Sequence, residues 1–235
     1  MSLQTISARA GFFAVAALAI SACSSGDPEA AFAGSSTATS NAAVQDAPSS
    51  VSVNGVALRL VLAPTGNAAR YRVRERLVGQ DLPNDAVGET KSLTGSIAID
   101  SAGKVIRGAS RFSVDAGSFV SDKNRRDGFV RGRLLQANQY PTVTLVPTEV
   151  RGVTLPLPKS GTVPIEMTGD LTVRDVMRPT IWKGTAQFRD GQVSGSAATS
   201  FTFDDVQMEQ PRVPVLLSVA DTIRLELDFN LVQQR

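Results

Sequence analysis

The sequence predicts an all-β domain of about eight antiparallel strands, and three observations support this. Apolar and polar residues alternate with a period of two from Val56 to the end of the chain. Turn-forming groups such as Ser101-Ala102-Gly103 and Asp190-Gly191 separate the alternating runs. Only one face of each run is apolar, which is typical of antiparallel strands with a single buried face. About eight such strands in one domain indicate a closed barrel or a sandwich, and closure removes exposed edges.

The last strand is the clearest. Every second residue from Ile223 to Leu231 is apolar, and the residues between them are polar or charged. In residues 70–77 the even-numbered positions are all arginine, which predicts one basic face and one mostly apolar face that includes Glu75. Shorter alternating runs occur at 96–100 and 111–115. Further strands are expected at 56–62, 142–150, 163–173, 179–189 and 193–203.

One segment, Ser121 to Asn138, departs from the β pattern and predicts a short helical excursion. Ser121 could cap the helix start and Asp122 suits a first turn. The apolar side chains would press on the mouth of the barrel: Phe129, Val130, Leu134 and Leu135. The basic side chains would remain mostly solvated: Lys123, Arg125, Arg126, Arg131 and Arg133.

The N-terminus predicts export and lipid anchoring. Residues 1–22 hold one charge, Arg9, and an apolar run from Gly11 to Ile20 that is too short for a membrane span, as in a signal peptide. Ile20-Ser21-Ala22-Cys23 resembles the bacterial lipobox, so Cys23 is the expected lipidation site. Residues 23–55 are rich in Ser, Ala, Gly and Thr and predict a flexible tether before a domain at 56–235. The expected location is the bacterial cell envelope, extracytoplasmic, with Ser24 favouring the outer membrane by analogy with enteric bacteria.

Composition excludes several function classes. The chain has no histidine and a single cysteine, which argues against His-dependent nucleophiles, most zinc sites and His-ligated haem. Lys plus Arg total 24 and Asp plus Glu total 22, so a nucleic acid is not the expected partner. Asp204-Asp205 is the densest acidic spot and is read as a solvated turn, not a metal site. We expect no catalytic residues, no metal and no cofactor.

Four segments in order resemble the YceI-like family of bacterial periplasmic proteins. Val114-Asp115 leads to the polar stretch Ser121–Asp127, and Gln139–Thr144 is similar to the family's Tyr-Pro-Thr strand opening. Gly169–Pro179 is similar to its Leu-Thr…Arg-Pro hairpin, and the strand Thr222–Val232 closes the order. The resemblance covers about residues 56–235. The sequence departs from the family pattern where ligand-contacting residues are expected. The family often has a His after its Arg-Asp, and this chain has Gly128-Phe129 there. Asp175 stands in place of the hairpin Gly, and Phe201–Asp205 stands in place of an Arg-x-x-Phe-Gly motif.

The resemblance implies an extended, lipocalin-like barrel whose cavity holds a polyisoprenoid, such as an isoprenoid quinone or polyprenyl carrier, or a similar amphiphile. Arg125, Arg126 and Arg131 are head-group candidates, with a solvated helix face as the alternative for each. Trp182 is the leading candidate for the cavity wall, and plain core packing is the alternative for every member of the set. The expected lining residues are Tyr71, Phe112, Phe119, Phe129, Leu135, Val143, Trp182, Phe201, Phe203, Leu225 and Phe229.

Two other functions remain open at this point. A structural or interaction lipoprotein would have a filled barrel and a working outer surface, for which the basic strand Arg70–Arg76 is the candidate. An enzyme that uses carboxylates alone would need two of them close together in a cleft. The sequence does not determine the ligand's tail length or head group, storage versus transport, or whether the domain works alone or as a homodimer.

Overall fold

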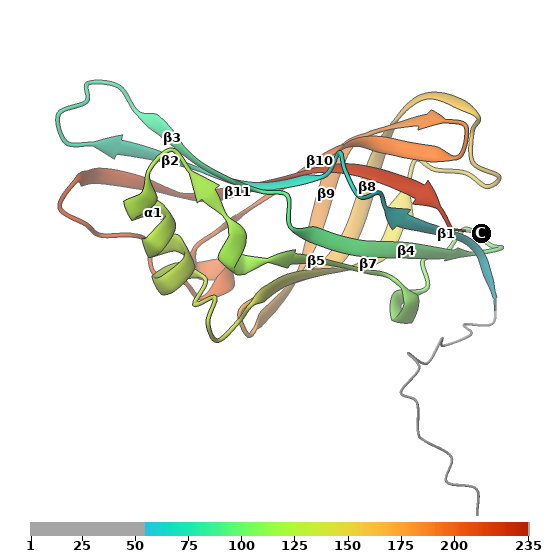
Figure 1. Cartoon of the computed structure of the whole chain (residues 1–235), viewed down its shortest axis with the longest axis horizontal. Helices are drawn as coiled ribbons and strands as arrows, with labels where there is room; N and C mark the ends of the chain where they lie inside the picture. The colour runs from blue at the N-terminus through green and yellow to red at the C-terminus, as the bar shows by residue number, and fades with distance from the viewer. Residues whose placement is uncertain (1–54, 235) are drawn as a thin grey trace, which may run out of the picture. The chain divides into compact units, whose positions relative to one another are not determined.

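Eleven antiparallel strands form one continuous sheet in the computed structural model, which describes residues 55–234 (Figure 1). The expected signal peptide, Cys23 and nearly all of the tether therefore lie outside the described residues. The strands are β1 (Val56–Leu62), β2 (Ala68–Leu77), β3 (Asn84–Thr90), β4 (Leu93–Asp100), β5 (Arg111–Asp115), β6 (Val120–Ser121), β7 (Thr142–Arg151), β8 (Ser160–Val173), β9 (Val176–Arg189), β10 (Gln192–Thr202) and β11 (Leu216–Gln233).

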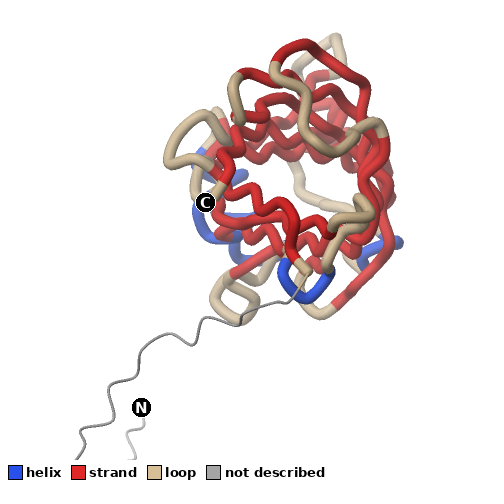
Figure 2. Tube along the Cα trace, turned by 90° about the vertical axis from the view of Figure 1, so that its right-hand side faces the viewer, coloured by secondary structure: helices blue, strands red, loops and turns tan. Residues whose placement is uncertain are grey.

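Eight of these strands close into a ring. The order is β1-β4-β5-β7-β8-β9-β10-β11, and β11 pairs back to β1 through Leu60↔Gln233 and Leu62↔Leu231. Figure 2 shows this ring of strands end-on. The predicted all-β, antiparallel barrel of about eight strands with a short helical excursion is therefore confirmed. Within residues 55–234, each of the eleven strands has at least one antiparallel partner in this sheet.

Three strands extend the barrel beyond the ring. β11 is 18 residues long, and most of its length also pairs with β2, which carries β3 and then β6. Alternation is interrupted between Val219 and Ile223 of β11, where the register shifts against β2. Such irregularities bend a strand and increase its twist, so the extension can curve into a wall that lengthens one half of the barrel.

A helical segment follows β6 and returns the chain to β7. It consists of α1 (Asn124–Phe129) and a π-helical turn, η3 (Val130–Leu134). Short 3₁₀ turns occur at η1 (Arg107–Ala109), η2 (Ala116–Ser118) and η4 (Asp204–Val206). Among the described residues, no helix has the length and apolar character needed to cross a membrane.

Two details of the expected elements are wrong. Ser121 does not cap the helix: it belongs to β6, and the residue before the helix, Lys123, makes no capping hydrogen bond. Arg126 is not solvated, because its side chain is largely buried against Glu75. The strands at 84–90 and 120–121 were not expected, since neither carries an apolar alternation of its own.

The end of the barrel where β9 ends, β10 begins and β11 ends is filled with side chains. Phe188, Val193, Phe229 and Leu231 are buried there, and the register places Val193 opposite both Phe188 and Leu231. Gly195 lies opposite Phe229, and a Cβ added at Gly195 would meet the Phe229 ring at 2.9 Å. The absence of a side chain at Gly195 thus lets this ring pack directly on the strand backbone. This end of the barrel is core, and the other end is hollow.

Candidate functional site

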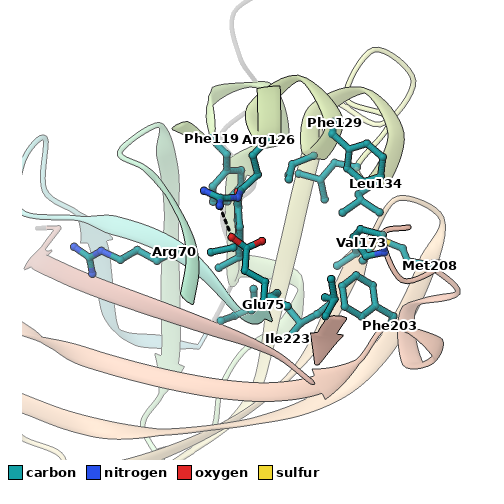
Figure 3. Close-up of a pocket in the computed structure, with 18 of the residues that line it drawn as sticks. Arg70, Glu75, Phe119, Arg126, Phe129, Leu134, Val173, Phe203, Met208 and Ile223 are labelled. Atoms are coloured by element: carbon teal, nitrogen blue, oxygen red, sulfur yellow. Dashed lines mark hydrogen bonds and ion pairs between the residues drawn. The ribbon is translucent and has the colours of Figure 1, made fainter. Parts of the chain in front are cut away.

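A cavity of about 720 Å³ occupies the extended half of the barrel. Its walls come from the inward faces of β2, β5, β7 and β8, from β9 to β11, and from the helical segment. Most of the lining side chains are apolar, and they include Leu145, Leu171, Val173, Ile223 and Leu227. In Figure 3, Phe129 and Leu134 of the helical segment lie together with Val173, Phe203 and Met208 on one side of the cavity.

Most of the expected lining residues lie on this cavity wall, but Phe229 does not. Phe229 belongs to the same face of β11 as Leu225, yet it lies further along the strand, in the filled end. The residues on the wall are Tyr71, Phe112, Phe119, Phe129, Leu135, Val143, Trp182, Phe201, Phe203 and Leu225. Of the head-group candidates, Arg125 and Arg126 line the cavity and Arg131 does not.

The indole of Trp182 has its polar atom satisfied within the wall. Trp182 is buried, and its Nε1 donates a hydrogen bond to Thr180 Oγ1 at 2.9 Å. Thr180 Oγ1 in turn donates to the Gly169 carbonyl of the neighbouring strand. Because the indole N–H already has a partner, Trp182 presents only apolar surface to the cavity.

Tyr71 is placed in the cavity by a glycine on the next strand. Gly88 is the register partner of Tyr71, and a Cβ at Gly88 would come within 2.2 Å of the Tyr71 ring. The ring therefore lies flat across β3 and contacts Phe119 with a centroid separation of 5.7 Å. Burial raises the pKa of the Tyr71 phenol to about 12, so the hydroxyl stays neutral at physiological pH.

One ion pair interrupts the apolar wall. Arg126 Nη2 donates to Glu75 Oε1 at 2.5 Å, and both side chains are largely buried (Figure 3). Arg126 also pairs with Asp122, one turn earlier. Burial opposes the charge of Arg126, but the carboxylates of Asp122 and Glu75 outweigh it and raise the guanidinium pKa. The cavity wall thus contains a buried, fixed ion pair whose charges compensate each other.

Asp127 fixes the helical segment to the edge of the extension. This carboxylate is 3% exposed and accepts hydrogen bonds from the backbone N–H of Ser121 at 2.8 Å and from its hydroxyl at 2.6 Å. Neighbouring residues 126 and 127 therefore hold the segment in two ways, Arg126 to β2 and Asp127 to β6. Together they explain the polar composition of residues 121–127 in a wall that is otherwise apolar.

The basic face of β2 is paired with acids on both sides. Arg70 contacts Glu89 and Asp228 at 2.6 Å each, and Arg72 contacts Asp85 at 3.3 Å and Glu226 at 3.5 Å. Arg74 also contacts Asp85, at 3.0 Å. Three of the four arginines in this strand are therefore neutralised within the sheet, and the strand does not form the free basic surface that a surface-interaction function would need.

The hairpin between β8 and β9 holds the η4 turn. Arg174 has a positive φ of 56°, and its Nη2 donates to the carbonyls of Val206 and Gln207. Arg178 contacts Asp205 at 2.6 Å and lies 5.3 Å from the centre of the Phe201 ring. Phe203 and Met208, on either side of η4, line the cavity, so these arginines position part of its wall.

Asp205 provides a pH-dependent contact in this turn. The backbone N–H of Thr202 donates a hydrogen bond to the Asp205 carboxylate. This bond is the largest cause that lowers the pKa of Asp205, to about 2, and the contacts with Arg178 and with the Thr202 side chain add to it. A lowered folded-state pKa adds stability above the unfolded value of 3.8, and this stability is lost as the pH falls toward 2. We expect Asp205→Asn to lower the free energy of unfolding by a constant amount above pH 5, with the difference closing between about pH 4 and pH 2. Urea unfolding at several pH values measures this, with Asp204→Asn as control; an unchanging difference down to pH 2 would contradict it.

Several lining residues were missed by sequence reasoning, which favoured aromatic side chains. Val73 shares its strand face with Tyr71, so the alternation in β2 could have identified it. Leu171 and Val173 lie in the Leu-Thr hairpin motif and could have been found in the same way. Met208, Pro211 and residues 213–216 follow η4 in a stretch without periodicity, and no sequence signal places them on the wall.

A barrel that is filled at one end and hollow and apolar at the other has the architecture of a small-ligand-binding barrel, as in lipocalins. The chain belongs to the YceI-like domain family, whose model matches residues 61–231. No curated protein matches it. Among solved structures, it is similar to a polyisoprenoid binding domain from Saccharophagus degradans, with a TM-score of 0.59 and 14% identity over 75% of this chain and 99% of that protein. It is also similar to BcnA from Burkholderia cenocepacia, with a TM-score of 0.53 and 14% identity over 72% and 98% of the two chains.

Proposed function

We propose that this chain is a membrane-tethered, extracytoplasmic binding protein that holds a polyisoprenoid or a similar amphiphilic lipid in its barrel. The observation that carries the proposal is the apolar cavity of about 720 Å³ inside a YceI-like barrel. This volume is in the range of roughly 300–1,000 Å³ that small-molecule sites occupy. The similar structure from Saccharophagus degradans is a polyisoprenoid binding domain, which supports the same ligand class.

The physical chemistry of the cavity favours a slender apolar ligand. A prenyl tail that buries about 400 Å² gains roughly 10 kcal/mol at about 25 cal/mol per Å², before the costs of association and ordering. No polar side chain is needed for that gain. The Glu75–Arg126 pair, with Tyr71 on the same strand as Glu75, provides the polar groups that a head group could meet.

A binding role, not catalysis, agrees with how the carboxylates of the cavity are arranged. Glu75 and Glu226 both line the cavity, but they lie far apart along the paired strands. Glu75 of β2 is opposite Val219 of β11, whereas Glu226 of β11 is opposite Arg70 of β2. Five residues along a strand separate these positions by about 16 Å at about 3.3 Å per residue. Each also has arginine partners. Among the described residues, no group of acidic side chains is placed to hold a metal ion.

The proposed membrane tether rests on the sequence. Ile20-Ser21-Ala22-Cys23 would supply an acylated N-terminus, and residues from Ser24 to the first strand would link it to the barrel. Acyl chains in pairs or triplets hold a protein firmly on a bilayer, whereas one chain binds only marginally. Metabolic labelling with a palmitate analogue would test this directly, because Cys23→Ala removes the only cysteine.

Native mass spectrometry tests the proposed ligand. The chain from residue 24 onward, expressed in bacteria, is expected to retain an adduct at one copy per protein, and solvent extraction should release a prenyl lipid. A clean apo mass that does not change after incubation with isoprenoid quinones and polyprenyl phosphates would refute the proposal. The protein would then be better described as an interaction lipoprotein whose cavity is unused.

A further inference from the structure

Two loops with exposed apolar side chains frame the open end of the cavity. The first is the turn between β2 and β3, where Val78 is 58% and Leu82 is 77% exposed. The second precedes and begins β11, where Val215 is 51% and Leu217 is 59% exposed. A backbone hydrogen bond from Val78 N–H to the Val215 carbonyl, at 3.0 Å, joins the two loops. We call Val78, Leu82, Val215 and Leu217 the mouth tips.

The mouth tips continue the cavity wall to the surface. Val78 and Val215 themselves line the cavity, as do the adjacent residues Leu77, Gln80 and Leu216. The apolar lining therefore runs without interruption from the interior to the exposed loops. Both loops lie at the same end of the barrel in Figure 1, opposite the start of β1 and the end of β11.

Packing within the domain does not explain these side chains. Turn residues are ordinarily polar or glycine, and Gly79, Asp81 and Pro83 suffice for the β2–β3 turn. Leu82 lies within this turn and is about three-quarters exposed, so it buries almost no apolar surface in the domain. Grouped apolar side chains at the entrance to a cavity instead indicate a surface that becomes covered by a partner.

The charges around the mouth indicate an anionic partner. Arg76, Arg125 and Arg212 are exposed, and none has an ion-pair partner within residues 55–234. Arg76 is register partner to Ser218, next to Leu217, and Arg125 lines the cavity. Two carboxylates, Asp81 and Glu209, share these loops. Apolar side chains with arginines beside them are what a surface inserting into anionic head groups requires.

We propose that the mouth tips dock on the surface of a phospholipid bilayer that contains anionic lipids, so that the cavity opens at the level of the lipid chains. The purpose of this docking, transfer of a lipid without passage through water, rests on the proposed function. The docking itself does not require an isoprenoid. The span before the barrel allows it: residues 24–54 can extend up to about 100 Å, whereas β11 spans about 60 Å. An anchor at Cys23 would therefore let the far end of the barrel reach the same membrane.

Vesicle co-sedimentation tests the proposal with residues 24–235, which lack any acyl anchor. The vesicles contain phosphatidylethanolamine and phosphatidylglycerol at three to one and no isoprenoid. The double variant Leu82→Asp/Leu217→Asp is expected to bind them at least about tenfold more weakly than the parent. The matched control is Met177→Asp/Ile181→Asp, which changes two apolar residues that are also more than half exposed, on the outer face of β9. This control should bind as the parent does.

A second measurement separates docking from ligand binding. Quenching of Trp182, the only tryptophan of the chain and a cavity residue, reports isoprenoid binding in detergent. The tip variant should keep the parent's affinity in this assay, which also shows that it is folded. Equal vesicle binding by parent and tip variant, or equal loss in the β9 control, would overturn the docking proposal while leaving the cavity function intact. So would a dimer in the ultracentrifuge that the tip substitutions dissociate, with no vesicle binding by the parent, because the mouth tips would then meet a second copy.

Discussion

Val73→Trp is expected to lower the affinity for a prenyl lipid by at least about thirtyfold, or about 2 kcal/mol. Val73 points into the cavity from β2, midway between Tyr71 and Glu75, and lies opposite Ile223 of β11. An indole at this position would occupy the space that a tail must pass through. Because the new side chain enters a cavity and not packed core, the free energy of unfolding should change by less than about 1–2 kcal/mol.

Isothermal titration with a solubilised isoprenoid quinone measures the affinity, and thermal unfolding measures the stability. Val87→Trp is the control, because Val87 pairs with the outward-facing Arg72 on the neighbouring strand and does not line the cavity. It should retain the parent's affinity. If Val73→Trp binds as tightly as the parent, the ligand does not occupy this part of the barrel.

Glu75→Gln should destabilise the domain by about 2–3 kcal/mol. The substitution keeps the shape of the side chain but leaves the largely buried Arg126 without one of its two carboxylate partners. Breaking a buried ion pair by removing one member costs about 3–5 kcal/mol, and the remaining contact with Asp122 reduces this. For a domain of this size the melting temperature should fall by about 4–12 °C.

The double variant Glu75→Gln/Arg126→Met distinguishes a lost ion pair from a general packing defect. Removing both charges leaves no buried charge unpaired, so the double variant should recover at least half of the lost stability. If it is as unstable as the sum of the two single variants, the contact between them contributes nothing. The wall would then depend on Asp127 and Ser121 for its connection to the helical segment.

Most strand positions could be predicted from the sequence, because a strand with one buried face has apolar residues at every second position. The expected strands at 56–62 and 142–150 differ from β1 and β7 by at most one residue at an end. β3 escaped detection because its inward residues, Ala86, Gly88 and Thr90, are small or polar. Small residues are required there, since the Tyr71 ring lies over Gly88. A strand that makes room for its neighbour cannot show an apolar alternation.

The cavity wall was predictable in part. Large aromatic residues on inward faces identified much of it, but no pattern in a single strand tells where the cavity ends and the core begins, as Phe229 shows. Glu75 stood on an otherwise apolar face, which signals a buried partner. That partner, Arg126, lies 51 positions away in sequence on an unrelated element, so only the folded chain could identify it.

The eighteen residues of β11 have a further consequence, for the order in which the molecule assembles. This strand pairs with β1, β2 and β10, and it follows all three of them along the chain, so it is synthesised after them. Until it arrives, three strands have unpaired edges, and such edges invite aggregation. Closing the ring joins residues more than 160 positions apart, for which non-local pairing predicts slow folding. The nascent barrel should therefore depend on holding chaperones until its final strand is available, and deletion of even its last few residues should leave an open, aggregation-prone sheet.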